Sequence, residues 1–362
     1  MFDLRLEETP LPASKRERDN LISWLIDNLC LHRRRGDDMA DGGTFSPIHR
    51  ILAENLLSNP NRGYETRELA DELDLTPAAI HHHFTRLISA GLVTATSGKG
   101  WRSYHLTGGS LSAAIEAMTT RAKLIHTQRL RILESVWKRG EDVSMEIELP
   151  PDERLPCNIR IKEWGPIKEG ENELSRFMCD MGLLGERPGK ENSPTSISVR
   201  LFELLLSTDS PLSLDEAAKK LGAPKPRVGR ILERFRSTGL VERIPRTDRL
   251  SSALWSAMTS QHGRRGEDWM LKKGGFERLD VPIALLKALK KGKLTPEMVT
   301  KVLKKMPARD QMLLLNLLGG RLPLGHRMAG KAVETVKKNS MADLERILRR
   351  IERVGKLLEQ SQ

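Results

Sequence analysis

The sequence has little of what several protein classes depend on. It contains three cysteines in 362 residues, Cys30, Cys157 and Cys179, and they form no Cys-x-x-Cys pair. A disulfide framework and a zinc ribbon both need more cysteines at closer spacing, so we expect ordinary thiols in a reducing cytoplasm. Aromatic residues make up only 4% of the chain, which argues against a fold built on large stacking platforms.

Long apolar segments and catalytic motifs are also missing. No run approaches the roughly 18 apolar residues of a membrane-spanning helix, so no membrane span is expected. The first ten residues, MFDLRLEETP, include acids and no apolar core, so no secretory signal is expected. No HExxH, GxSxG or GxGxxG motif is present, and GLLGERPGK at 182–190 departs from a phosphate-binding loop at Leu184 and Glu191. We therefore expect neither an enzyme nor a bound cofactor.

Basic residues are plentiful and unevenly placed. The chain has 60 Lys and Arg against 48 Asp and Glu, a net charge of +12. Residues 263–362 hold 23 basic and 11 acidic side chains, whereas residues 44–110 hold six of each. A basic half of this kind favours polyanions, first nucleic acid and then acidic membrane surfaces. The alternative is a solvated, lysine-rich surface.

An internal repeat organises the chain. The first copy is ETRELADELDLTPAAIHHHFTRLISAGLV at 65–93, and the second is SLDEAAKKLGAPKPRVGRILERFRSTGLVERI at 213–244. Each copy has a short helix containing alanine, a tight turn, a longer helix and then Gly-Leu-Val. At about 150 residues per domain, the length accommodates both copies as separate domains.

The spacing of the first copy predicts each of its parts. Thr76 is suited to cap the longer helix, Pro77 to occupy its first position and Gly91 to end it in the left-handed conformation. A buried stripe is formed by Ile80, Phe84, Leu87 and Ile88. The alternating segment that follows is interrupted by Ser-Gly-Lys-Gly at 97–100, which predicts a hairpin.

The second copy predicts the same two helices, but its pattern defines the hairpin less clearly. Ser213 and Glu216 have capping-box spacing, and Gly222 ends the short helix. The buried stripe of its longer helix consists of Val228, Ile231, Leu232 and Phe235. The following segment, IPRTDRLSS, has no glycine, so the pattern does not define a hairpin there.

Helix, turn, recognition-type helix and hairpin together are a winged helix-turn-helix. The first copy resembles ArsR-type regulators through Thr76, His82-His83-Phe84, Ala90-Gly91-Leu92-Val93 and Tyr104-His105-Leu106-Thr107. The resemblance covers about 46–140 and implies a DNA-binding fold whose long helix after the wing builds a dimer. ArsR-type metal sensors carry Cys-x-Cys near the short helix, and this chain has none there, so metal sensing is not carried over. The second copy resembles winged helices more generally.

The candidate DNA contacts are polar or basic residues of the recognition helices, 76–90 and 225–238, and of the wings. They are Thr76, His81, His82, Thr85 and Arg86 in the first recognition helix, Lys99 and Arg102 in the first wing, Lys225, Arg227, Arg230 and Arg234 in the second recognition helix, and Arg246 and Arg249 in the second wing. The alternative for each is a solvated or packed position. Consecutive histidines at 81–83 point about 100° apart on a helix, so they are unsuited to share one metal ion.

The expected fold class is mainly α with small β wings. The expected domains are an N-terminal helix and loop (1–43), the ArsR-like winged helix with its long following helix (44–142), a β-hairpin and linker (143–195), a second winged helix (196–262) and a basic C-terminal helical domain (263–362). Within them we expect a helix at 14–31, paired strands at 145–149 and 158–164, and helices at 326–338 and 341–359. Apolar residues between 344 and 358 form a short heptad seam, suited to packing in the C-terminal bundle or to a dimer zipper.

The apolar stripe along 111–138 is longer than one winged helix needs. It predicts a homodimer through Ile115, Met118 and Ile125, or else packing on the second winged helix of the same chain as a pseudo-dimer. The function expected is a cytoplasmic, nucleoid-associated transcriptional regulator that binds double-stranded DNA. An architectural or interaction protein of chromosome organisation, replication or polymerase assembly is the alternative, and RNA binding is a third.

Overall fold

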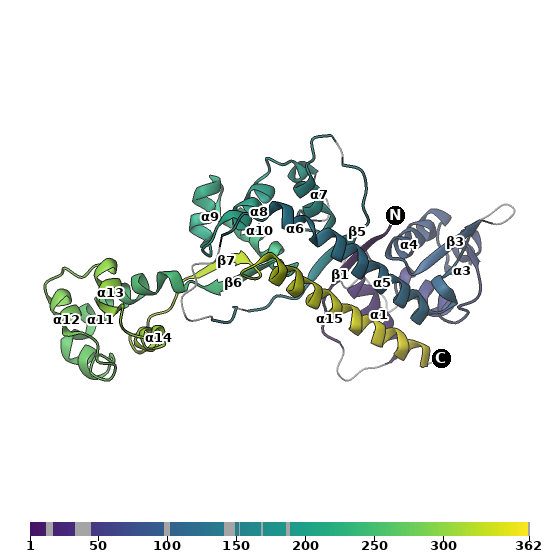
Figure 1. Ribbon diagram of the computed structural model, residues 1–362. Helices are drawn as coiled ribbons and strands as arrows, with labels where there is room; N and C mark the ends of the chain where they lie inside the picture. The colour runs from purple at the N-terminus through teal and green to yellow at the C-terminus, as the bar shows by residue number, and fades with distance from the viewer. Residues whose placement is uncertain are drawn as a thin grey trace.

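Two winged helices with the same order of elements form the body of the molecule, and a helical module projects from the second one (Figure 1). The structure is a computed structural model that describes residues 1–11, 17–32, 45–97, 102–140, 149–151, 153–167, 169–185 and 189–360. The fold is mainly α with small β elements, as the sequence predicts. No helix within these ranges is long and apolar enough to cross a membrane.

The first winged helix has the order of elements that the sequence predicts. Its three strands form an antiparallel sheet in the order β2-β4-β3, with the hairpin strands paired from Val93 opposite Leu106 to Ser97 opposite Arg102. Its elements are α2 (Pro47–Arg50), the π-helical η1 (Ile51–Leu56), β2 (Tyr64–Glu65), α3 (Thr66–Leu73), α4 (Pro77–Ala90), β3 (Val93–Ser97), β4 (Arg102–Leu106), η2 (Thr107–Gly109) and α5 (Leu111–Leu130).

The second winged helix repeats this order. Its helices α8 (Ile197–Ser207), α9 (Leu214–Leu221) and α10 (Lys225–Ser237) correspond to η1, α3 and α4. Its wing pairs β6 (Val241–Pro245) with β7 (Leu324–Met328) in antiparallel register. A bridge between Leu212 and His326 takes the place that Tyr64 opposite Tyr104 has in the first copy. The repeat found in the sequence is therefore a repeat of the whole winged helix.

The wing of the second copy contains an inserted helical module. The module lies between β6 and β7 and has an apolar core of its own, separate from the core that the two winged helices share. Its elements are η4 (Thr247–Arg249), α11 (Leu250–Lys272), α12 (Ile283–Lys290), α13 (Pro296–Leu303) and α14 (Ala308–Leu317).

The insertion changes two boundaries expected from the sequence. The border at 262/263 falls inside α11, and the expected helix at 326–338 consists of strand β7 and the start of α15 (Val333–Gln360). The partner of β7 lies before the whole module in the chain. A local pattern does not contain that pairing, which also explains why IPRTDRLSS shows no hairpin turn.

The two long helices that follow the wings pack against each other. α5 and α15 run antiparallel, because the Ser112 N–H donates to Glu359 Oε1 at 2.8 Å, whereas His126 Nε2 lies 2.9 Å from Ser340 Oγ further along. Gly355 permits a close approach, since a Cβ there would lie 2.5 Å from Ile115 Cδ1. Each long helix therefore begins at its own winged helix and ends beside the other one.

This packing uses the apolar stripes that the sequence assigns to self-association. Ile115, Met118 and Ile125 are only 1%, 1% and 7% exposed. The heptad seam of α15 packs against α5 and α1 (Arg18–Asn28), and neither inside the C-terminal helical module nor in a dimer zipper. The stripe of α5 is therefore covered within the chain by α15, and Ile115, Met118 and Ile125, the contact expected for a homodimer, are buried there.

The N-terminal segment joins the two halves. β1 (Asp3–Glu7) pairs antiparallel with β5 (Asn158–Lys162), and Phe2 packs against Gly91 at the end of α4. The partner expected for 158–164 was 145–149; residues 145–148 lie outside the described ranges, and β5 pairs with β1 instead. The remaining elements of this junction are α6 (Ile132–Val136), α7 (Glu173–Asp180) and η3 (Gly189–Asn192).

A buried ionic cluster fixes the geometry of the junction. The Asp180 carboxylate, on α7, lies 2.9 Å from Arg129 Nη2 and 3.1 Å from Arg176 Nε. Arg129 belongs to α5 and also donates to the Lys162 carbonyl of β5 at 3.0 Å. Loss of one partner from such a buried set costs about 3–5 kcal/mol, so the cluster favours this one arrangement of α5, α7 and β5.

Protonation of His126 should weaken the α5–α15 pairing. Burial lowers the pKa of His126 to about 4, so between pH 6.5 and 4 the unfolded chain binds a proton that the folded chain excludes. Stability from this residue is therefore present above pH 6.5 and is lost as the pH falls, by about 3 kcal/mol in all. In urea unfolding at several pH values, His126→Gln should flatten the pH dependence, whereas His262→Gln on α11 should not. Equal pH dependence in both variants would contradict the assignment.

Candidate nucleic-acid interface

The first recognition helix, α4, forms as its sequence predicts. The Thr76 hydroxyl accepts a hydrogen bond from the Ala79 N–H at 3.3 Å, Pro77 occupies the first turn, and Gly91 ends the helix at φ +85°. Phe84 is buried and stacks on Tyr104 of the wing with ring centroids 4.3 Å apart. The helix is thus held by its cap and by its buried stripe, with the opposite face exposed.

That exposed face is almost uncharged and is polar apart from Ile88, which the sequence assigned to the buried stripe but which is 36% exposed. Thr76, His81, His82 and Thr85 are all exposed. His81 Nδ1 lies 3.4 Å from the Tyr104 hydroxyl, and Thr85 donates its hydroxyl to the His81 carbonyl at 2.8 Å. Imidazole and hydroxyl groups at the start of a helix suit contacts with base edges or phosphates.

Two other residues of α4 are turned toward the protein. Burial, then the charges of His82 and Arg86, lower the pKa of His83 to about 4, so its half-buried imidazole is neutral at pH 7. Arg86 donates from Nη1 to the Leu31 carbonyl at 2.8 Å and so ties α4 to the segment after α1. The structure therefore places Arg86, expected as a DNA contact, in an internal contact. In the first wing Arg102 is exposed, and Lys99 lies outside the described residues.

The second recognition helix, α10, presents a basic face. Lys225, Arg227 and Arg230 are exposed in its first two turns. Lys225 Nζ lies 2.7 Å from Asp215 Oδ1, but an ion pair between two exposed side chains contributes only about 0–1 kcal/mol. A phosphate can replace such a partner at little cost. The two recognition helices therefore offer different chemistry, imidazole and hydroxyl on α4 and guanidinium on α10.

The later arginines of α10 hold the protein together. The half-buried Arg234 packs beside Gly185, where a Cβ would lie 3.4 Å from the guanidinium carbon. Arg236 is only 8% exposed and donates to the Glu153 carbonyl at 2.7 Å. Arg234 was expected to share a DNA-facing row with Arg227 and Arg230, but its side chain lies against the segment that follows α7.

The arginines of the second wing differ sharply in exposure. The Arg246 side chain is 6% exposed, binds Glu216 and lies 2.7 Å from Asp248 Oδ2. Burial alone would lower the pKa of Arg246, but its hydrogen bonds to both carboxylates outweigh burial and raise it. Arg249 is 49% exposed and lies 2.9 Å from Glu216 Oε1. Arg246, expected as a DNA contact, is therefore a structural residue at the base of the wing.

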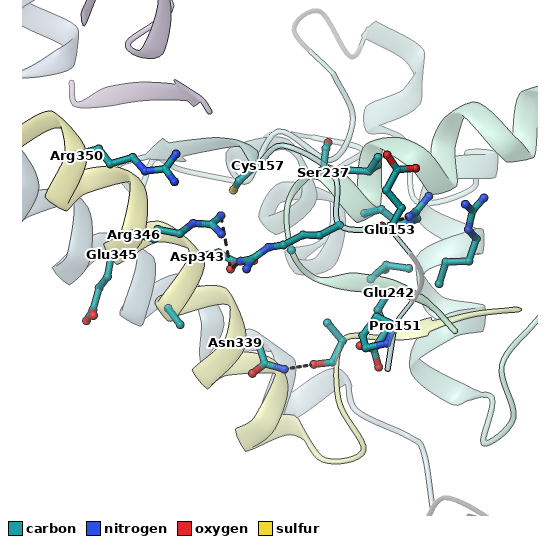
Figure 2. Close-up of a pocket in the computed structure, with 18 of the residues that line it drawn as sticks. Pro151, Glu153, Cys157, Ser237, Glu242, Asn339, Asp343, Glu345, Arg346 and Arg350 are labelled. Atoms are coloured by element: carbon teal, nitrogen blue, oxygen red, sulfur yellow. Dashed lines mark hydrogen bonds and ion pairs between the residues drawn. The ribbon is translucent and has the colours of Figure 1, made fainter. Parts of the chain in front are cut away.

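A groove beside α15 was not anticipated from the sequence. It has a volume of about 1080 Å³ and is bordered by α15, the end of α10, and Pro151, Glu153, Arg154, Leu155 and Cys157 (Figure 2). Its arginines are paired: Arg346 and Arg350 bind the two Glu8 oxygens at 2.8 and 2.9 Å, and Arg154 binds Asp343. Cys157 at its edge is inert, because burial raises the pKa of its thiol to about 12.

The described residues do not assemble a metal site. Among them, no group of three or more His, Cys, Asp or Glu side chains converges in a way that could hold a metal ion. Cys157 and Cys179 are buried and Cys30 is partly buried, each without a disulfide.

Comparison with known families identifies both winged helices. Residues 55–95 match the family model described as "Bacterial regulatory protein, arsR family", and residues 195–245 match that described as "IclR helix-turn-helix domain". The chain thus carries two helix-turn-helix domains of DNA-binding families, and the ArsR resemblance of the first copy is confirmed. No curated protein and no solved structure matches the chain.

Arg246→Ala and Arg249→Ala should separate structural from exposed arginines. Arg246→Ala leaves two carboxylates without their buried partner and should cost about 2–3 kcal/mol of folding free energy. Arg249→Ala removes a half-exposed pair and should cost under about 1 kcal/mol. Urea unfolding checks both. If Arg246→Ala instead keeps full stability and loses DNA affinity, Arg246 contacts DNA as the sequence suggested.

Proposed function

We propose that this chain is a transcriptional regulator that binds duplex DNA with both of its winged helices and acts by binding, without catalysis. The observation that carries the proposal is the antiparallel pairing of α5 with α15. In ArsR-type regulators the corresponding long helices of two subunits build the dimer. Here α15 takes the place of the partner's helix, so one chain has the two DNA-reading units of a dimer.

The exposed recognition faces support binding to an asymmetric site. A dimer with identical halves reads a palindrome, because operator symmetry mirrors protein symmetry. In this chain α4 offers His82 and Thr85, whereas α10 offers Arg227 and Arg230. Arginine favours guanine and phosphate, and small polar side chains make weaker base contacts. We infer two unlike half-sites, each in a major groove, within one duplex of the cytoplasmic nucleoid.

A second candidate keeps the fold and changes the partner. The uncharged face of α4 and the balanced charge of residues 44–110 also suit docking on another protein, as in an architectural or assembly factor. Selection of bound duplexes from random sequence distinguishes the two. Recovery of one defined motif supports the regulator, and recovery of unrelated sequences or none supports the interaction protein.

Substitutions on the two recognition helices should have different effects. Arg230→Ala should weaken binding to preferred and scrambled duplexes alike and make the slope of log K against log salt shallower by about 1, because one phosphate contact is lost. His82→Ala should lose about 1–3 kcal/mol mainly on the preferred duplex. Salt titrations measure both, with the exposed Arg349→Ala on α15 as control. If Arg230→Ala leaves the affinity and the salt slope unchanged, the interaction protein is favoured over the regulator.

The stoichiometry should be one chain per duplex. Because α15 covers the stripe on α5, light scattering at tens of micromolar should give the mass of a monomer, and mass measurement of the complex should give one chain. Replacing the α10 half-site by a second copy of the α4 half-site should weaken binding, although it makes the site palindromic. A dimeric protein that prefers the palindrome would contradict the pseudo-dimer proposal.

A further inference from the structure

The module inserted in the second wing carries most of the net charge of the chain. Residues 250–322 contain 14 basic and six acidic side chains, a net of +8 out of +12. All 14 basic residues are exposed. The structure describes this stretch throughout, and within it the one ion pair is Lys290 with Glu267, at 2.5 Å. The positive charge is therefore largely uncompensated inside the module.

The core of the module is built without these charges. This core consists of apolar residues of α11–α14 and of the turns between them, among them Leu254, Phe276 and Leu314. Clustered like charges repel each other and destabilise a compact state. Eight of them form two clusters at helix ends: Lys287, Lys290, Lys291 and Lys293 in the last turn of α12 and just after it, and Lys301, Lys304, Lys305 and Arg309 from the last turn of α13 to the first turn of α14. Such a surface suits an anionic partner.

The position of the module indicates which anion it meets. It replaces the tip of the wing, the part of a winged helix that lies along the duplex beside the recognition helix. In Figure 1 it extends beyond the second winged helix, away from α4. A groove of about 650 Å³ lies between the module and the second winged helix, and its lining on the module side includes Ser256, Ser260, Arg264 and Arg321. Hydroxyl and guanidinium groups are common partners of DNA phosphates.

We propose that the module is a third DNA-contacting element, which binds the sugar-phosphate backbone beyond the half-site of α10. The inference rests on the proposed function, since the second winged helix brings the module to the duplex. Lysines dominate both clusters, and lysine binds phosphate as a point charge without reading bases. The module therefore lengthens the contact on one side and adds affinity that is independent of sequence.

The test compares three double variants of the full chain on the preferred duplex. Lys291→Ala/Lys293→Ala and Lys304→Ala/Lys305→Ala remove module charges, and Lys338→Ala/Lys356→Ala removes two exposed lysines of α15 as control. Each lost phosphate contact should reduce affinity roughly eightfold at 0.1 M salt and make the salt slope shallower by about 0.9. Hydroxyl-radical footprints of the module variants should shorten at the α10 end only. Shortening the duplex at that end should weaken the wild type and leave the module variants little changed.

Arg230→Ala in the same titration distinguishes a failure of this inference from a failure of the proposed function. If the module variants match the wild type in slope and footprint while Arg230→Ala weakens binding, the inference is overturned and the regulator stands. If the wild-type chain binds no duplex, both fail. If the module variants lose binding to vesicles of anionic lipid but keep full duplex affinity, the partner is a membrane surface and the inference is again overturned. Circular dichroism confirms that each variant is folded.

Discussion

The antiparallel pairing of α5 with α15 is the contact on which the rest of the structure depends. Each helix carries an apolar stripe too long to be buried by its own winged helix, and each stripe is buried by the other. Gly355 beside Ile115 sets the closeness of the pair, and the contacts of Ser112 with Glu359 and of His126 with Ser340 set its register. Because each helix leaves directly from a wing, this register also sets where α4 and α10 lie.

The pairing has a consequence for the second wing. β7 must lead into α15, so its position is fixed by the long helix as well as by its pairing with β6. Between these two anchored strands the chain is free to carry an insertion, provided that the insertion folds around a core of its own. The module of α11–α14 meets that condition, and it adds charge at the wing tip without disturbing the core of the winged helices.

Arginine has two roles in this protein, and burial decides between them. Arg129, Arg236 and Arg246 are buried, with carboxylate or carbonyl partners that join segments far apart in the chain, and the buried Arg176 pairs with Asp180 one helical turn away. Arg230 and Arg264 are exposed. A buried guanidinium without such partners would cost several kcal/mol, so the structural arginines are committed to the fold. Only some of the basic residues on a predicted recognition helix are therefore available to contact DNA.

The local parts of the fold were predictable from the sequence. The cap at Thr76, the left-handed Gly91, the capping box of Ser213 with Glu216 and the buried stripes of α4 and α10, apart from the exposed Ile88, all follow from contacts between residues close in the chain. These gave two recognition helices and the first hairpin, and with them the candidate contacts His82, Arg227 and Arg230. The positions of Arg86, Arg234 and Arg246 were not predictable, because their partners are Leu31, the loop at Gly185 and Glu216.

The sequence by itself determined that the chain has two helix-turn-helix units of unlike charge, since periodicity, capping and composition act over a few helical turns. Only the tertiary structure decided three other features. These are the pairing of β1 with β5, the pairing of β6 with β7 on the far side of a whole helical module, and the packing of α15 against α5. Each of these pairings brings together residues far apart in the chain, and an apolar stripe or a strand edge does not encode which of several complementary surfaces will cover it. That choice depends on the packing of all elements together, and it covered the stripe of α5 with a helix from the other end of the same chain.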